Sequence, residues 1–393
     1  MSEHSSPCQQ RSPAADQMRR RTRRSLVQLA FFGVILFLIL FLNRPQSNKK
    51  TFAWTKIRYK TTSATLPEAR GICPGLAGSE KPALVVSRVA ADGDSSWFDG
   101  LAHLYHLCVY TADAPADKNS RHLQVPANRG HEAMAYLTFL IDNYAHIPEA
   151  GVVFVHGSRW SWHNDAPDYD NAALLAALNV SAALEPWGYH NLRCDWSAST
   201  CPPSTPPQGS LETSLQAVLD PWDARAVSDK ALPRALAALF GGDEYKGSGE
   251  LLLGRTDAVR AQCCAQFVVA RNRVWQHSRD EYVALRQWLL DGSSDKHFRS
   301  SNAAPSDDRV AGRILSYIWH ILFIKQGEST AQSAYGGVDL ERLNAIACPR
   351  ADECYCRLYG RCNLEHCTRG SCYGQYRVPP DFRLPDDWAA IHS

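Results

Sequence analysis

The sequence predicts an α/β fold, with a mixed or mostly parallel sheet flanked by helices. Short β-branched runs at 83–90 and 151–156 are typical of buried strands. Between them, residues 133–144 place apolar side chains at the spacing of one helical face. Strands that alternate with a helix are characteristic of α/β domains. The composition, 45% hydrophobic and 21% charged over 393 residues, is that of a globular protein and argues against a disordered or many-span chain.

The first element along the chain is an uncharged apolar run at 26–42, whose 17 residues are at the lower limit for crossing a hydrocarbon core. Five Arg between positions 19 and 24 precede the run, which favours a cytosolic N-terminus, and no small-residue cleavage site follows it. We therefore expect a basic cytosolic tail at 1–25, a transmembrane signal anchor at 26–43 and a stem at 44–81. This is the layout of a single-pass type II membrane protein of the Golgi or endoplasmic reticulum.

The remaining elements build a lumenal α/β domain at 82–345. Strands are expected at 104–111 and 263–270 in addition to the two above. Ser278 and Glu281 have the spacing of a capping box, which predicts a helix that Gly292 ends. Other helices are expected at 172–184, 228–240 and 310–323, and the last of these is apolar nearly all round.

The charge distribution excludes strong nucleic-acid binding by this domain. The first 25 residues carry a net charge of +4 and the whole chain +2, so the remainder is at −2. A nucleic-acid surface needs a basic patch that such a domain lacks.

The cysteines indicate an oxidising compartment. Twelve of the 13 follow the apolar run, and six crowd into a C-terminal module at 346–393. A zinc site is the alternative, but the usual Cys-x2-Cys pairs are absent. The Asn179-Val-Ser181 sequon, a candidate glycosylation site, lies on the same side of the membrane. The disulfide candidates are Cys194 and Cys201, which could pair with each other, and Cys348, Cys354, Cys356, Cys362, Cys367 and Cys372.

A first candidate site precedes the 133–144 helix. Asn128, Arg129, Gly130 and Glu132 lie where a glycine turn presents backbone N–H groups, and Arg129 could add a charged fork to a diphosphate. The alternative is an ordinary helix start, with Glu132 placed favourably in the first turn.

A second candidate site follows the 151–156 strand. Ligands bind at the carboxyl ends of strands in open α/β sheets. His156, His163 and Asp165 could there hold Mn²⁺ or another divalent cation, and His163 could instead move a proton. The alternative is that Trp side chains pack here and the His and Asp cap the next helix. Two Asp-x-Asp pairs, at 92–94 and 168–170, have the spacing that bridges a metal and a diphosphate in many sugar transferases, a weak signal in a chain of this length.

A third candidate site is a polar stripe on the 310–323 helix. Arg313, Ser316 and His320 stand at i, i+3 and i+7, and buried polar groups need partners. The stripe therefore faces a polar pocket, a ligand or another chain, or else belongs to a structural hydrogen-bond network.

Six segments, in order, are similar to the fungal family catalogued as domain of unknown function 3431. They are VPANRGHEAMAYLTFLIDNY, VVFVHGSRWSWHND, GYHNLRCDW, CCAQFVVARN, GRILSYIWHILF and CYCRLYGRC, and the similarity covers about residues 82–375. The resemblance implies no reaction. It implies that the shared blocks hold Asn128, Gly130, Glu132, His156, Trp162, His163, Asn164, Asp165, Asn191, Arg193, Trp319 and His320.

Topology and candidate sites together favour a glycosyltransferase-A-like enzyme that takes a sugar from a nucleotide-sugar donor to a glycan or small-molecule acceptor. In this hypothesis Asn128 to Glu132 approach the diphosphate, and His163 and Asp165 bind metal or acceptor. Arg313 or His320 then stabilises the leaving group. The alternatives are a non-catalytic, disulfide-stabilised lumenal accessory or binding protein, and a metal-dependent enzyme that acts on a small metabolite.

Overall fold

The computed structural model describes residues 13–42, 56–61, 67–113, 121–241, 258–293, 302–324 and 340–376. Cys8, residues 44–55 and 62–66 of the predicted stem, and the end of the predicted C-terminal module lie outside these ranges. The described part of the predicted stem packs on the domain, where Ile57, Tyr59, Cys73 and Leu76 are buried in the core. The chain divides into two units, residues 1–46 and residues 47–393, and each is described by itself.

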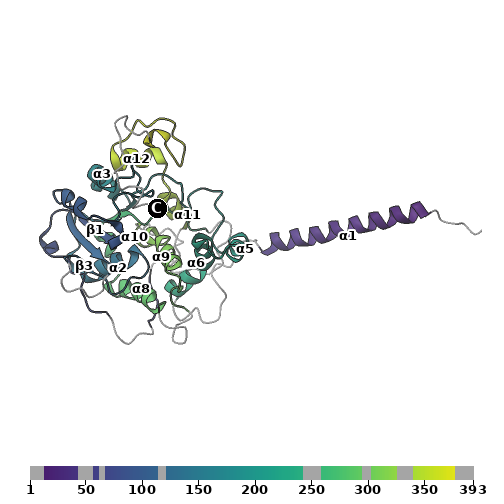
Figure 1. The fold of residues 1–393 in the computed structure, drawn as a ribbon, viewed down its shortest axis with the longest axis horizontal. Helices are drawn as coiled ribbons and strands as arrows, with labels where there is room; N and C mark the ends of the chain where they lie inside the picture. The colour runs from purple at the N-terminus through teal and green to yellow at the C-terminus, as the bar shows by residue number, and fades with distance from the viewer. Residues whose placement is uncertain are drawn as a thin grey trace, which may run out of the picture. The chain divides into compact units, whose positions relative to one another are not determined.

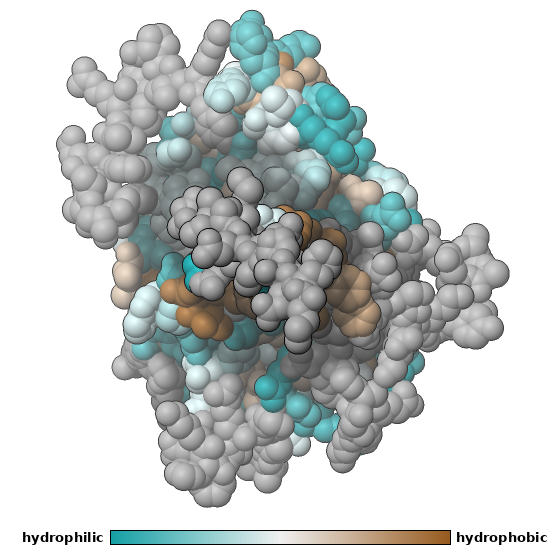
Figure 2. Space-filling model, turned by 90° about the vertical axis from the view of Figure 1, so that its right-hand side faces the viewer, coloured by the Kyte–Doolittle hydropathy of each residue, from teal (hydrophilic) through white to brown (hydrophobic). Residues whose placement is uncertain are grey.

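The first unit contains one long helix, α1 (Pro13–Leu42). Its stretch Thr22–Phe41 is 20 residues long with a mean hydropathy of 2.2, long and apolar enough to span a membrane, as a signal sequence also is. The Leu, Ile, Val and Phe side chains of this stretch are exposed. Figure 2 shows strongly hydrophobic residues, in brown, gathered in one part of the space-filling view.

The second unit is built on a six-stranded mixed sheet, as the sequence predicts (Figure 1). The strand order is β3-β2-β1-β4-β6-β5. Strands β1 to β4 run parallel, and β6 is antiparallel to both of its neighbours, β4 and β5. The strands are β1 (Ala83–Arg88), β2 (His106–Thr111), β3 (Leu123–Gln124), β4 (Val152–His156), β5 (Tyr189–Asn191) and β6 (Phe267–Val269).

Helices cover both faces of the sheet, because its central strands are apolar on both sides. Val85 and Phe154 face one core, whereas Leu84 and Val153 face the other. The first core packs against α2 (Glu132–Asp142), α6 (Ala224–Phe240), α8 (Arg279–Asp291), α9 (Asp308–Ser316) and α10 (Trp319–Phe323). The second packs against η3 (Ser96–Leu101), α3 (Asn171–Ala177), α4 (Val180–Leu184) and α12 (Ala351–Tyr359). The other α-helices of the described part of the domain are α5 (Leu211–Leu219), α7 (Arg271–Val274) and α11 (Leu340–Ala347).

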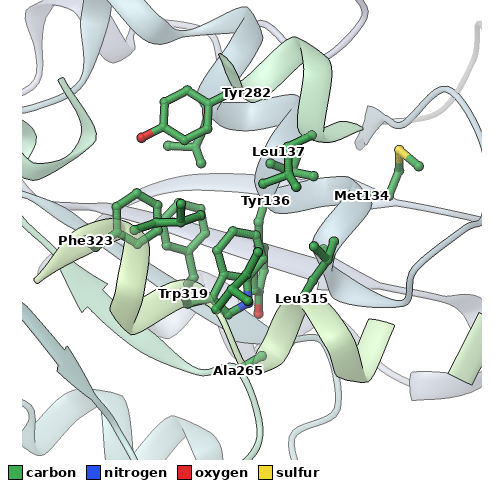
Figure 3. Packing of buried hydrophobic residues seen from close by; sticks show 14 of the residues in the cluster. Met134, Tyr136, Leu137, Ala265, Tyr282, Leu315, Trp319 and Phe323 are labelled. Carbon is green, nitrogen blue, oxygen red and sulfur yellow. The ribbon is translucent and has the colours of Figure 1, made fainter. Parts of the chain in front are cut away.

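Aromatic side chains fill the first core (Figure 3). Trp319 stacks on Phe323 with ring centroids 6.0 Å apart, and Tyr136 and Tyr282 lie 6.2 and 6.4 Å from Trp319 and Phe323 respectively. Large rings of this kind bury much apolar area each, so they contribute heavily to the stability of the domain.

Two predicted helices are each broken in the structure. The helix expected at 172–184 is α3 followed by α4, because Asn179 caps a new helix by accepting a hydrogen bond from the Ala182 backbone N–H. The helix expected at 310–323 is α9 followed by α10, with Tyr317 and Ile318 between them. The strand expected at 263–270 shortens to β6, and the helix expected from residue 228 begins at Ala224 with Asp223 as its cap.

The predicted pairing of Cys194 with Cys201 is wrong. Cys194 bonds to Cys354 and Cys201 to Cys348, so the two long disulfides join the middle of the domain to its C-terminal segment. The bonds Cys356–Cys362 and Cys367–Cys372 close short local loops. The remaining pairs are Cys73–Cys108 and the adjacent Cys263–Cys264. Two disulfides therefore link residues 340–376 covalently to the α/β domain.

Candidate functional site

The strand order creates a topological switch point, a candidate ligand-binding position, between β1 and β4. From β1 the chain adds β2 and then β3 on one side of the sheet, whereas β4 is added on the other side of β1. The strand order therefore reverses between β1 and β4. In open α/β sheets, ligands bind outside the carboxyl ends of the strands at such a switch point. The carboxyl ends here are Arg88 of β1 and His156 of β4.

His156 is the centre of the polar groups at this position. Its Nε2 lies 2.6 Å from the Cys264 carbonyl oxygen, and its Nδ1 lies 3.9 Å from Oε2 of Glu132, the first residue of α2. The side chains of His156 and Glu132 are 20% and 13% exposed. The ring of His163 meets that of His156 edge-on, with centroids 4.6 Å apart. Glu132 and His156 thus form a half-buried acid and base pair whose facing atoms could also hold a divalent cation.

Asp92 approaches this pair from the β1 side. It ends the short helix η2 (Ala90–Asp92) and accepts a hydrogen bond from the Val89 backbone N–H at 2.8 Å. Burial raises the pKa of its carboxyl, and the Val89 hydrogen bond, His156 and Arg88 act in the opposite direction. A carboxyl with a raised pKa beside a histidine is a candidate proton donor.

Gly157 allows the ends of the two strands to come this close. A Cβ at this position would lie 2.4 Å from Cβ of Arg88 and 2.7 Å from Oδ2 of Asp92. Any side chain here would therefore push Asp92 away from His156.

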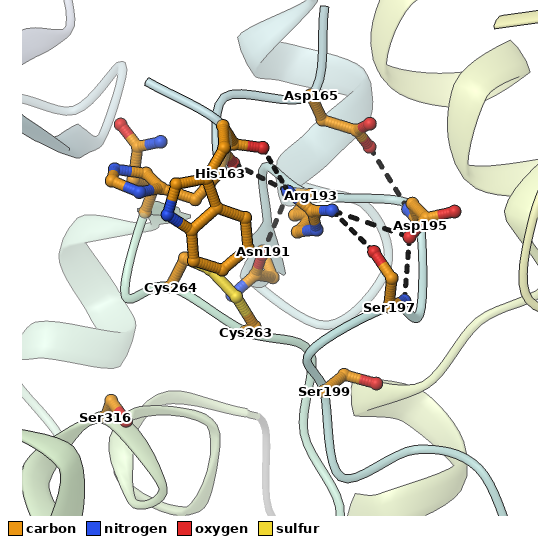
Figure 4. The surroundings of a disulfide bond; sticks show 12 residues. His163, Asp165, Asn191, Arg193, Asp195, Ser197, Ser199, Cys263, Cys264 and Ser316 are labelled. Carbon is orange, nitrogen blue, oxygen red and sulfur yellow. Dashed lines mark hydrogen bonds and ion pairs between the residues drawn. A yellow bond between two sulfur atoms is a disulfide. The ribbon is translucent and has the colours of Figure 1, made fainter. Parts of the chain in front are cut away.

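The structure separates Asp165 from the two histidines with which it is predicted to hold a metal. Asp165 is buried, and its carboxylate accepts hydrogen bonds from the backbone N–H groups of Cys194 and Asp195 and from the Tyr355 hydroxyl. In Figure 4 this carboxylate is directed toward Asp195 and not toward His163. Desolvation raises the pKa of Asp165, while Arg193 and these hydrogen bonds lower it. These contacts give Asp165 a role in holding the loop after β4 against β5 and α12.

Apart from Asp92, the residues of the two Asp-x-Asp pairs serve local structure. Asp170 caps α3 and forms a two-bond ion pair with Arg159, at 2.9 Å for each bond. Asp94 accepts hydrogen bonds from Ser96, and Asp168 accepts one from the Asp170 backbone N–H. Within the described ranges, three potential metal-ligand side chains gather closely only at Cys73, His106 and Cys108, where the two cysteines are bonded to each other.

The predicted diphosphate cradle before α2 is occupied by the protein itself. The Gly130 backbone N–H donates to the Asp308 carboxylate at 2.5 Å, and Arg129 pairs with the same carboxylate at 2.9 Å. Arg129 is buried and also donates to the carbonyl oxygens of Leu289, Pro305 and Ser306. Asn128 is exposed, which leaves Glu132 as the member of this segment that faces His156.

The predicted polar stripe is divided by the break between α9 and α10. The charge of Arg313 acts on Asp229 of α6 and on Tyr317, and the Ser316 hydroxyl donates to the Arg313 carbonyl oxygen. His320 is buried in α10. The three residues therefore do not form one continuous polar stripe.

A cleft of about 640 Å³ opens beside the loop after β4. One wall is formed by Trp162 and Asn164 of this loop, the floor by Arg193 and Asp195, and the opposite wall by Ser371 and Tyr373 of the C-terminal segment. The cleft adjoins the switch point because the rings of Trp162 and His163 lie 5.5 Å apart.

The sequence does not identify the cleft, and it marks Asp92 only through the Asp-x-Asp pair at 92–94. Arg193 and Trp162 appear only as members of shared blocks, and their partners on the C-terminal segment are about 170 to 210 residues away in the chain. The sequence feature that could have identified Trp162 and Arg193 is their residue type and position, because each follows the end of a strand, where binding residues are common.

Comparison with known proteins gives one family match. The family model described as "Protein of unknown function (DUF3431)" matches residues 84–357, which confirms the resemblance carried by the six ordered segments. No curated protein and no solved structure matches the chain.

Proposed function

This chain belongs to the DUF3431 family, and we propose that its α/β domain is a glycosyltransferase-like enzyme that faces the lumen of the secretory pathway. The observation that carries the proposal is the convergence of Asp92, Glu132 and His156 at the carboxyl ends of β1 and β4. A nucleotide sugar is a ligand of the size and polarity that switch-point crevices take.

The proposed orientation is supported by three independent features. An arginine-rich segment precedes the apolar stretch of α1, a sequon follows it, and the described domain holds six disulfides. Disulfides persist in oxidising compartments, and basic clusters stay in the cytosol. A type II anchor in the Golgi or endoplasmic reticulum satisfies all three.

In the proposed reaction, an acceptor hydroxyl oxygen forms a bond to the anomeric carbon of the sugar while the bond from that carbon to the phosphate oxygen breaks. The hydroxyl proton passes to Nδ1 of His156, because Nε2 donates to the Cys264 carbonyl oxygen, and Glu132 beside Nδ1 stabilises the positive charge that results. Asp92, with its raised pKa, donates a proton to the departing phosphate or orients His156. Mn²⁺ or another divalent cation would be held by Glu132 and Nδ1 of His156 and would neutralise the diphosphate, and in that case His156 would not also act as the base.

Thermal unfolding of the purified full-length chain tests this proposal. A ligand that binds only the folded state at 100 times its Kd stabilises it by about 2.7 kcal/mol, which raises Tm by several degrees. We expect one nucleotide sugar, with or without Mn²⁺, to raise the Tm of the wild type, and His156→Ala to abolish that rise. His103→Ala, in an exposed loop, should retain it. If no nucleotide sugar changes the Tm of the wild type, the transferase proposal is wrong.

A second candidate function is a non-catalytic lumenal sugar-binding protein. The observation in its favour is the cleft, whose exposed aromatic wall does not require the switch-point residues. It predicts sugar binding without any nucleotide-sugar binding.

A further inference from the structure

The cleft beside the loop after β4 combines flat aromatic surfaces with polar groups. Trp162 is 56% exposed and Tyr373 is 73% exposed, whereas other Trp and Tyr residues of the domain, such as Trp288 and Tyr355, are buried. Trp196 adds a third ring to the lining, and its Nε1 already donates to the Pro349 carbonyl oxygen. Exposed aromatic faces that flank a cleft mark a binding surface, and the C–H faces of sugar rings pack well on them.

The polar groups on the floor of the cleft carry balanced charges. The Arg193 side chain is 6% exposed and lies 3.5 Å from the Asp195 carboxylate, which is equally buried. Arg193 also donates to the Ser197 hydroxyl at 2.7 Å, whereas its buried Nε has no hydrogen-bond partner in the described part of the chain. A buried donor without a partner is costly, so a ligand that accepts a hydrogen bond there stabilises the site. Because Asp195 already compensates the charge of Arg193, the floor favours a neutral ligand over an anionic one.

The far wall of the cleft is held rigidly in place. Ser371 lies in the loop closed by the Cys367–Cys372 disulfide, and Tyr373 follows it directly. In this loop the Gly370 carbonyl oxygen accepts a hydrogen bond at 2.7 Å from the Trp196 backbone N–H. A Cβ at Gly370 would lie 2.9 Å from the Trp196 ring, so this close contact requires glycine. A rigid wall lowers the entropy lost on binding.

The near wall connects the cleft to the switch point. Arg193 Nη1 donates to the carbonyl oxygens of Trp162 and His163, which fixes the main chain between the two sites. The rings of Trp162, His163 and His156 follow one another at centroid distances of 5.5 and 4.6 Å. His163 therefore lies between the cleft and the reacting groups proposed above.

We infer that this cleft binds a neutral oligosaccharide and is the acceptor site of the domain. Sugar binding rests on the cleft alone, whereas the acceptor role rests on the proposed function. Trp162 and Tyr373 supply the stacking surfaces, and the Nε–H of Arg193, whose other N–H groups already donate to the protein, supplies one hydrogen bond to a hydroxyl group.

The test uses the full-length chain in a detergent without a sugar head group, so that the detergent does not compete. The probes are neutral oligosaccharides of mannose, galactose, glucose or N-acetylglucosamine, with a sulfated oligosaccharide as the charged comparison. Binding is measured by tryptophan fluorescence and by saturation-transfer NMR. We expect Trp162→Ala and Tyr373→Ala each to weaken binding of a neutral oligosaccharide at least tenfold. Trp222→Ala, at a position that is 80% exposed and outside the cleft, is the matched control and should stay within twofold of the wild type.

The same preparations distinguish this inference from the proposed function. Trp162→Ala should keep the rise in Tm produced by the nucleotide sugar, and His156→Ala should keep oligosaccharide binding. Oligosaccharide binding without any nucleotide-sugar binding would retain the cleft as a sugar site and overturn its acceptor role. The cleft assignment itself is overturned if no neutral oligosaccharide binds, if the sulfated one binds more tightly, or if Trp162→Ala binds as the wild type does.

Discussion

His320 is a buried polar residue whose protonation affects the stability of the whole domain. It is 1% exposed in α10, and neither of its ring nitrogens has a hydrogen-bond partner among the described residues. Burial lowers its pKa to about 3, because the apolar core around it cannot solvate a charged imidazole. In the unfolded chain the pKa returns to about 6.5.

The stability of the domain should therefore fall on acidification. The native state keeps His320 neutral below pH 6.5 while the unfolded state takes up a proton, so stability is lost as the pH drops from 6.5 toward 3, by up to about 1.4 kcal/mol per pH unit. We expect His320→Leu to lose this part of the pH dependence, measured by urea unfolding between pH 7 and pH 4.5. An exposed-residue control, His103→Leu, should follow the wild-type profile. Equal slopes for wild type and His320→Leu would contradict this account.

Among the elements, those set by local patterns are predictable and those set by packing are not. The strand 152–156, the helix 132–142 and the Ser278–Glu281 capping box follow from periodicity and capping chemistry. The break at Tyr317 and Ile318 does not, because neither residue stops a helix and tertiary contacts decide it.

The candidate site was predictable to a similar degree. His156 is identified by its place at the carboxyl end of a predicted strand, and Glu132 by its place at the start of a predicted helix. The use of Asp308 as the anion for Gly130 and Arg129 requires a residue about 178 positions away, and disulfide partners cannot be derived from the number of cysteines alone.

The two long disulfides should show strongly non-additive contributions to stability. Cys194–Cys354 closes a loop of 160 residues, and Cys201–Cys348 lies only seven and six residues inside it. Once one bond exists, the other closes a loop of about 15 residues, which the chain-entropy model values at about 3 kcal/mol, against about 5 kcal/mol for the long loop. Replacing one pair by serine should cost about 3 kcal/mol and replacing both about 8 kcal/mol, as measured by urea unfolding. Replacing Cys356 and Cys362, which close a short loop, should cost about 2 kcal/mol, and equal increments for the long pairs would argue against this explanation.

For the molecule as a whole, the decisive property is the side of the membrane on which the domain lies. Asn179 is exposed at the start of α4, and its Oδ1 accepts the capping hydrogen bond, which leaves its Nδ2 as the atom to which a glycan attaches. We expect glycosidase treatment of the protein from a eukaryotic host to increase its gel mobility, and Asn179→Gln or Ser181→Ala to give the faster band without treatment. An unchanged band in the wild type would count against a lumenal domain with an occupied sequon.

The position of the cleft's far wall also affects biosynthesis. Ribosomes release a chain from its N-terminus onward, so the loop containing Tyr373 leaves the ribosome after nearly all of the domain. Its partners across the cleft, Trp162 and Arg193, are synthesised some 180 to 210 residues earlier. The cleft is complete only after the two long disulfides have joined the C-terminal segment to the domain. Oligosaccharide binding would thus appear only in chains that are complete and correctly oxidised, which makes it a built-in measure of successful maturation.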